Sequence, residues 1–161
     1  MSEETSEIKL TVNGDLITKT VNVRQHLVDF LRLELGLTGS HLGCEHGICG
    51  ACSVWVDGLV VRGCLMLAVQ ADGGDVTTIE GLTETGEIAD LQKNFVDRNA
   101  LQCGFCTPGM LMTLAELLRK SELSSREEIR EHISGNYCRC TGYHAIVDAV
   151  ETTIRDRLGD S

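Results

Sequence analysis

The sequence predicts an α+β protein in which a small sheet comes first and a set of helices follows. In the first half, apolar and polar residues alternate in short runs, which is the period of a strand with one buried face. After Gly81 the apolar residues recur every three or four positions, which is the period of a helix. Eight cysteines, four in each half, indicate that something besides a hydrophobic core stabilises the 161 residues.

Two hairpins, one helix and a last strand are expected in the first half. Asn13-Gly14 offers the positive φ angles of a tight turn between two alternating runs, and Asp57-Gly58 joins a second pair. Gly36 follows a run with helical spacing and can end that helix. The expected strands are residues 8–12, 16–23, 54–56, 59–61 and 76–79, and the expected helix covers 27–35.

Four helices are expected in the second half. Thr107-Pro108 supplies an N-cap followed by the first helical position that proline favours, and Ser125 with Glu128 has the pattern of a capping box. The change of period places a boundary near residues 80–86. We therefore divide the chain into domains 1–82 and 83–161. The expected helices cover residues 88–95, 110–118, 129–133 and 145–154.

Charge and hydropathy exclude two classes of partner. Lysine and arginine total 14 against 24 acidic residues, and a formal charge of -10 disfavours a surface that neutralises nucleic-acid phosphates. No apolar run approaches the roughly 20 residues of a membrane helix. The acidic first residues do not resemble a secretory signal, so we expect a cytoplasmic protein. In that reducing compartment, cysteines are expected to be metal ligands or redox-active thiols.

The first cysteine set has the spacing of a plant-type 2Fe-2S ferredoxin. Cys44-x4-Cys49-x2-Cys52 is followed after eleven residues by Cys64. Three glycines in the same loop allow the backbone to approach a cluster closely. A zinc site with four cysteine ligands is the alternative, but it usually has two Cys-x2-Cys knuckles and only one occurs here. Buried thiols without a ligand explain such a loop less well.

The second cysteine set consists of Cys103-x2-Cys106 and, 31 residues later, Cys138-x-Cys140. The first pair precedes a predicted helix, whose N-terminal dipole favours a thiolate, and the second pair precedes the last helix. This arrangement predicts a cluster held at the ends of two helices. A thioredoxin-like dithiol at Cys103 and Cys106 is the alternative, although such a pair normally follows a strand, which is not expected here.

Three motifs in this order carry a resemblance to a known family. They are residues 43–52 (GCEHGICGAC), 102–109 (QCGFCTPG) and 135–143 (GNYCRCTGY). Along nearly its full length, the chain resembles the small iron-sulfur subunit of the molybdenum hydroxylases, the xanthine oxidase family. The resemblance implies an N-terminal β-grasp, plant-type ferredoxin-like domain and an all-α four-helix-bundle domain, each with one 2Fe-2S cluster.

The resemblance also implies partners and a direction of electron flow. A large molybdopterin subunit would perform the hydroxylation, a medium FAD subunit would receive the electrons, and the complex would be a dimer of heterotrimers. Gln102 and Cys140 would contact the pterin, and no residue of this chain would be catalytic. The first electron acceptor would be held by Cys103, Cys106, Cys138 and Cys140, and the second by Cys44, Cys49, Cys52 and Cys64.

Two other functions fit the same residues. A free-standing two-cluster ferredoxin would be a carrier that purifies alone and has a polar surface. A cysteine-based redox sensor would contain labile, substoichiometric iron. Copurification and iron content distinguish both from a subunit whose partners supply the substrate chemistry.

Overall fold

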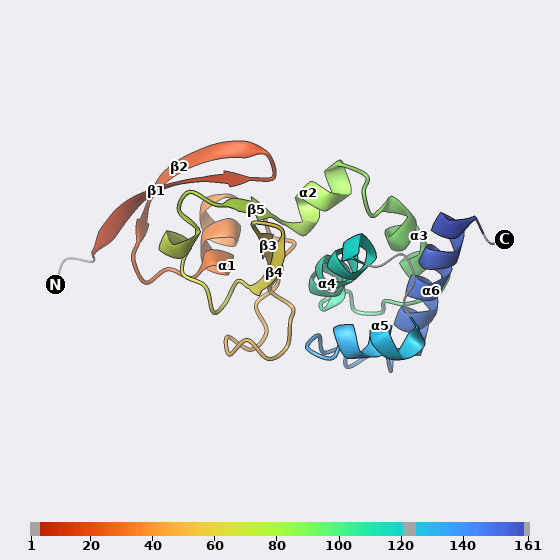
Figure 1. The fold of residues 1–161 in the computed structure, drawn as a ribbon. Helices are drawn as coiled ribbons and strands as arrows, with labels where there is room; N and C mark the ends of the chain where they lie inside the picture. Colours follow the sequence, from red (N-terminus) through yellow and green to blue (C-terminus); the bar gives the residue numbers. More distant parts are fainter. Residues whose placement is uncertain (1–3, 121–124, 160–161) are drawn as a thin grey trace.

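The computed structural model describes residues 4–120 and 125–159 and places two halves side by side (Figure 1). The sheet forms the N-terminal half, the helices form the C-terminal half, and the first and last described residues lie far apart. This mixed arrangement confirms the predicted α+β class. None of the helices in the described ranges has the length and apolar character needed to cross a membrane.

Five strands form one mixed sheet in the order β2-β1-β5-β3-β4. The strands are β1 (Thr5–Val12), β2 (Asp15–Asn22), β3 (Ser53–Val56), β4 (Leu59–Arg62) and β5 (Asp75–Thr77). β1 and β5 pair in parallel, whereas both hairpins are antiparallel. Asn13 and Gly14 have φ angles of 52° and 90°, which confirms the predicted tight turn between β1 and β2.

The helix predicted over residues 27–35 forms in two pieces that pack on the sheet. α1 (Leu27–Asp29) continues into a π-helical turn, η1 (Phe30–Glu34). Gly36 follows with a φ of 70°, so it ends the segment in the left-handed conformation that favours glycine. The core between helix and sheet includes Ile8, Leu10, Leu27, Phe30, Leu31, Val54 and Val76.

The prediction of a strand over residues 76–79 is wrong at its end. β5 stops at Thr77, and an unpredicted helix, α2 (Ile79–Glu84), begins two residues later. Thr78 explains the change, because its N–H donates to Asn13 Oδ1 (2.8 Å) and its hydroxyl donates to Glu80 Oε2 (2.6 Å). These side-chain partners replace the backbone partners of a strand. A 3-10 turn, η2 (Ala68–Ala71), precedes β5.

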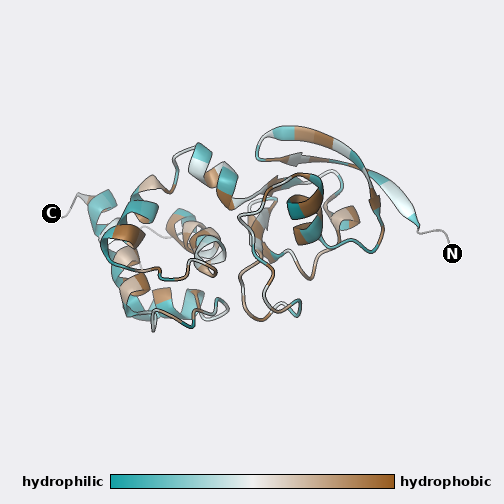
Figure 2. Ribbon diagram, turned by 180° about the vertical axis from the view of Figure 1, so that it is seen from behind, coloured by the Kyte–Doolittle hydropathy of each residue, from teal (hydrophilic) through white to brown (hydrophobic). Residues whose placement is uncertain are grey.

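The second half contains the four predicted helices. They are α3 (Ala89–Asp97), α4 (Thr107–Lys120), α5 (Arg126–His132) and α6 (His144–Leu158). The capping box of α5 is confirmed, since the Glu128 N–H donates to Ser125 Oγ (3.2 Å) and the Ser125 N–H donates to Glu128 Oε2 (2.7 Å). Brown and teal segments alternate along the helices in Figure 2, as expected where each helix buries one face.

The N-cap predicted for α4 is wrong by one residue. The Met110 N–H donates to Cys106 O (3.0 Å), so the first helical bond begins at Cys106 and Thr107 lies inside the helix. The residue at the start of the helix is Cys106, one of the eight cysteines. One of the candidate ligands therefore occupies the very start of α4.

α4 joins the two halves. It lies beside β3 and β4 (Figure 1), and Trp55 of β3 is part of the helical core. The Trp55 indole is 1% exposed and donates from Nε1 to Met112 O on α4 (3.0 Å). The Arg119 guanidinium lies 4.0 Å above the centre of the same ring. Packing across this junction fixes the position of the sheet relative to the helices.

Candidate metal centres

The first cysteine set lies on the loop before β3 and on the turn after β4. Cys44 and Cys49 are partly exposed, whereas Cys52 and Cys64 are 2% and 0% exposed. The backbone N–H groups of His46 and Cys49 both donate to Cys44 Sγ at 3.4 Å. The loop therefore turns its amides toward a cysteine sulfur, as the glycine-rich sequence predicts.

Two glycines of this loop adopt a conformation that favours glycine and lie close to other residues. Gly47 and Gly50 have φ angles of 75° and 74°, a region that residues with a Cβ rarely adopt. A Cβ on Gly47 would lie 2.3 Å from Leu65 Cδ1, and a Cβ on Gly50 would lie 2.6 Å from Gly135 O. At Gly50 the clash is with a backbone oxygen and a buried amide, so glycine is required there, whereas at Gly47 the exposed Leu65 side chain could move and the positive φ is the main cost.

The thiols of the first set differ in acidity. The Cys49 and His46 amides lower the pKa of the Cys44 thiol to about 6, so this sulfur is readily ionised. Burial raises the pKa of Cys52 to about 12. A thiol of that kind loses its proton when a metal cation binds to it, because the cation compensates the buried negative charge. The set therefore contains one thiol that ionises readily and one that would ionise on binding a metal.

The second cysteine set is assembled from two separate loops. Cys103 and Cys106 lie on the loop before α4, and Cys138 and Cys140 lie on the loop between α5 and α6. The Cys140 and Cys103 sulfurs are 3.6 Å apart, although 37 positions separate them in the chain. Burial, together with the neighbouring Cys138 thiol, raises the pKa of Cys106 to about 12. The structure thus brings the predicted residues together.

A hydroxyl group contacts one sulfur of the second set. Thr141 Oγ1 donates to Cys138 Sγ at 3.1 Å. Burial acts to raise the pKa of Cys138, but the hydrogen bonds from Thr141 and from nearby backbone amides outweigh it and leave that pKa lowered. This loop, like the first, contains hydrogen-bond donors that favour a thiolate.

The donor chemistry of both sets fits a 2Fe-2S cluster. Each set offers four sulfur ligands, which is the number that such a cluster takes. Within the described part of the chain, no three or more His, Cys, Asp or Glu side chains converge on a single-ion position.

The two sets are connected by direct contacts between their loops. The Tyr137 N–H donates to Cys49 O (2.8 Å), which links the two cysteine loops through the backbone. His41 stacks on Phe105 with ring centres 4.7 Å apart, and His41 Nδ1 lies 2.7 Å from Phe105 O. A Cβ on Gly109 would lie 2.2 Å from Gly50 O, so α4 approaches the first loop as closely as its backbone allows.

Asn136 is a positioning residue that the sequence reasoning missed. It is 2% exposed, and its Nδ2 donates to Gly50 O (3.2 Å) and to Gly109 O (3.1 Å). Its Oδ1 accepts from Thr113 Oγ1 (3.1 Å). The amide therefore joins both cysteine loops to α4. The available signal was its place in the motif of residues 135–143, but that motif predicts no role for the asparagine itself.

Gln102 lies at the exposed edge of the second set. Its Nε2 donates to Cys140 O at 3.0 Å, so the two residues predicted to contact a pterin are adjacent. Cys103 and Cys140 are exposed as well. This edge is open to a partner, in contrast to the buried Cys52 and Cys64.

Comparison with known families matches both halves to iron-sulfur domains. Residues 10–78 match the family described as "2Fe-2S iron-sulfur cluster binding domain", and residues 78–151 match "[2Fe-2S] binding domain". The chain is 54% identical over 148 residues to the caffeine dehydrogenase subunit gamma of Pseudomonas sp. (strain CBB1), covering 90% of this chain and 89% of the relative. The chain belongs to the small iron-sulfur subunits of the molybdenum hydroxylases.

Other relatives agree with this family membership. The nicotine 6-hydroxylase small subunit of Paenarthrobacter nicotinovorans is 51% identical, over 89% of this chain and 87% of the relative. The quinoline 2-oxidoreductase of Pseudomonas putida 86 has a chain that superposes with a TM-score of 0.90 and 45% identity, covering 99% of this chain and 100% of that one. As a member of the family, this chain carries two 2Fe-2S clusters.

Proposed function

We propose that this chain is the electron-transfer subunit of a molybdenum-dependent hydroxylase or dehydrogenase and conducts electrons from the molybdenum centre to FAD. A 2Fe-2S cluster, when bound, takes up and releases one electron. We assign the molybdopterin to a large partner subunit and the FAD to a medium one, in a cytoplasmic dimer of heterotrimers. Relatives named as the gamma or small subunits of larger enzymes support this assignment.

The second cysteine set is proposed to hold the cluster that receives the electron first. Cys103 and Cys140 are exposed, whereas Cys52 and Cys64 of the first set are buried. This difference carries the proposal, because an electron must enter where a partner's cofactor can come close to the acceptor. The ligands at the entry side would be Cys103, Cys106, Cys138 and Cys140, and those at the exit side Cys44, Cys49, Cys52 and Cys64.

Gln102 and Cys140 are proposed to face the pterin. The hydrogen bond from Gln102 Nε2 to Cys140 O holds the side-chain amide beside the exposed sulfurs of the second set. An amide in that position offers donor and acceptor groups to a heterocyclic ring. We expect the surface around this pair to be covered by the large subunit.

The division into domains 1–82 and 83–161 is also part of the proposal. The mixed five-stranded sheet with its packed helix supports a β-grasp domain, and α3, α4, α5 and α6 around one core support a four-helix bundle. α2 lies across the proposed boundary and contacts α4.

The experiment uses Gln102→Ala in the assembled enzyme. Cluster reduction is followed spectroscopically with two donors, a substrate of the large subunit and dithionite. Caffeine, nicotine and quinoline are the first substrates to try, since relatives are named for them. We expect slower reduction by substrate and an unchanged rate with dithionite.

The matched control is Gln92→Ala on α3, whose amide donates to Thr83 Oγ1 (2.8 Å) and lies outside both cysteine loops. Neither rate should change in this control. A wild-type rate with substrate in Gln102→Ala, or an equal slowing with both donors, would exclude a specific place for Gln102 beside the pterin. A tagged chain that purifies with both clusters and no partner subunit would instead support a free-standing carrier.

A further inference from the structure

In the turn after the last cysteine pair, the hydroxyl of Thr141 donates a hydrogen bond to the sulfur of Cys138. Thr141 Oγ1 donates to Cys138 Sγ (3.1 Å) and at the same time accepts from the Tyr143 N–H (3.3 Å). The Tyr143 N–H occupies an acceptor position of the Thr141 hydroxyl oxygen. The one proton of that hydroxyl can therefore point toward the Cys138 sulfur. Hydrogen bonds arranged in such a chain polarise one another, so the bond to sulfur is strengthened.

The backbone conformation of the turn holds this chain of bonds. Gly142 and Tyr143 have φ angles of 65° and 69°, so two consecutive left-handed residues bring the Tyr143 amide back toward Thr141. The Cys138 N–H donates to the Tyr143 hydroxyl (2.9 Å), which closes the turn from its other side. The backbone N–H and the side-chain hydroxyl of Tyr143 are therefore both hydrogen-bonded to the segment that carries Cys138.

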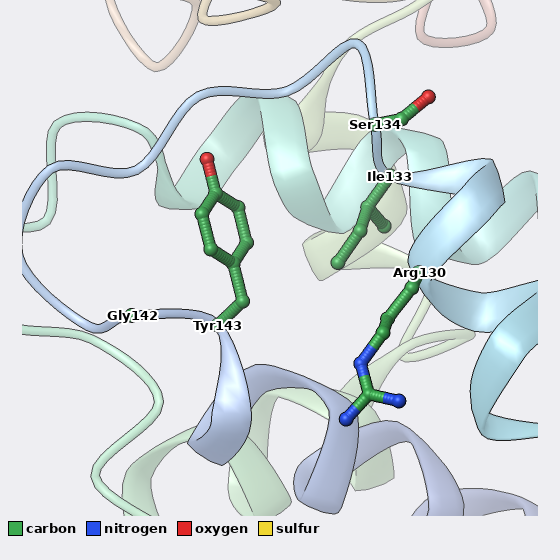
Figure 3. A pocket seen from close by; sticks show the side chains of 5 residues that line it. All are labelled: Arg130, Ile133, Ser134, Gly142 and Tyr143. Atoms are coloured by element: carbon green, nitrogen blue, oxygen red, sulfur yellow. The ribbon is translucent and has the colours of Figure 1, made fainter.

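The Tyr143 ring is positioned from outside the turn as well. It lines a pocket of about 340 Å³ together with Arg130 and Ile133 of the preceding helix region (Figure 3). Figure 3 shows the ring standing across from the Ile133 side chain. The ring also packs against the helical core, which holds it from outside the turn.

The first cysteine set receives a different kind of hydrogen bond. The bonds to Cys44 Sγ come from the backbone amides of His46 and Cys49, at 3.4 Å each. A backbone donor cannot be removed by a side-chain substitution, whereas the Thr141 hydroxyl can. The second set thus has one hydrogen bond to sulfur that a substitution can remove, in addition to bonds from backbone amides of the kind that the first set receives.

We propose that Thr141 is a positioning residue that raises the reduction potential of the cluster at the second cysteine set. Adding one electron increases the negative charge on the cluster and its sulfur ligands, and a donor to Cys138 Sγ stabilises that charge. The proposal deepens the proposed function and rests on Cys138 being a ligand. Its effect is to make the entry side a better electron acceptor.

The test is Thr141→Val in the complete enzyme, because valine keeps the branched shape and removes the hydroxyl. Midpoint potentials of both clusters are measured by dithionite titration with electron paramagnetic resonance. We expect the potential of the second-set cluster to fall, that of the first-set cluster to stay, and Thr141→Ser to restore the wild-type value. Thr152→Val is the matched control, since its hydroxyl donates to Asp148 O on α6 (2.8 Å), and neither potential should move.

Three results would overturn the proposal. The first is full loading of both clusters in Thr141→Val with unchanged potentials. The second is an equal shift of both potentials, which would indicate a general change of the protein. The third is loss of the second-set cluster in both Thr141→Val and Thr141→Ala but not in Thr141→Ser, which would make the hydroxyl a requirement for assembly. Failure of the ligand assignment is recognised separately, because Cys138→Ser would then retain the wild-type iron content.

Discussion

The two cysteine sets differ in how the chain assembles them. The first lies within residues 44–64, on one loop and the turn after the next hairpin. In the second, α4 and α5 separate the two pairs, and the Cys103 and Cys140 sulfurs meet across 37 positions. A local loop therefore determines one site, and the packing of helices determines the other.

The two cysteine sets also differ in solvent exposure, and this difference supports the proposed order of electron transfer. Cys52 and Cys64 are enclosed by their own half, whereas Cys103 and Cys140 stand at an open edge. A site made from the ends of helices can be presented to a partner without opening a core. The contrast shows that two sets of four cysteines can differ in exposure, one with two buried thiols and the other with two exposed thiols.

The largest expected effect tests whether the two sets are independent. Cys106→Ser removes one of four ligands, so we expect the second cluster to be lost and iron to fall from about four to about two per chain. Acid-labile sulfide should fall in parallel, and one of the two paramagnetic signals should remain. Cys52→Ser is the reciprocal variant and should remove the other signal. Loss of both signals in either variant would contradict separate sites.

A second prediction concerns the contact between α4 and the first cysteine loop. A Cβ at Gly109 would lie 2.2 Å from Gly50 O and 3.0 Å from Ala51 O, both backbone atoms that cannot rotate away. We expect Gly109→Ala to destabilise the protein by about 3 kcal/mol. The thermal midpoint should fall by roughly 6–12 °C, since about 2–4 °C accompanies each kcal/mol in a chain of this size.

Gly86→Ala is the control for this steric effect. Gly86 has a φ of 74° and no atom within 4 Å of an added Cβ, so only the backbone conformation opposes the substitution. It should cost about 1–2 kcal/mol. A larger loss in Gly86→Ala than in Gly109→Ala would mean that the halves do not meet as closely as the structure places them.

The smallest expected effect concerns how much Trp55 contributes to stability where β3 packs against α4. Trp55→Phe keeps an apolar ring in the core but removes the donor to Met112 O and part of the surface below Arg119. We expect a loss of about 1–2 kcal/mol, measured by circular dichroism during heating. Tyr137→Phe removes the hydroxyl of a ring that is 56% exposed and should leave the midpoint unchanged. Equal midpoints for both variants would argue against a structural role for the indole N–H.

Local patterns in the sequence determined most of the elements. The Asn13-Gly14 turn, the left-handed Gly36 and the Ser125 capping box were predicted because each depends on residues only a few positions apart. The N-cap of α4 was wrong by one residue, and the larger error, at the end of β5, occurred where a distant partner decides the outcome. The Thr78 N–H donates to the side chain of Asn13, which is far away in the chain, instead of to a neighbouring strand. β5 therefore ends and α2 can begin.

The sequence also determined the eight candidate ligands, because thiol chemistry and the spacing of cysteines are local properties. Only the tertiary structure decided which sulfurs are buried, that Cys103 meets Cys140, and that Asn136 joins both loops to α4. These facts depend on which helix packs against which loop. A buried amide is identified by the carbonyl groups around it, and those carbonyls come from residues far apart in the chain.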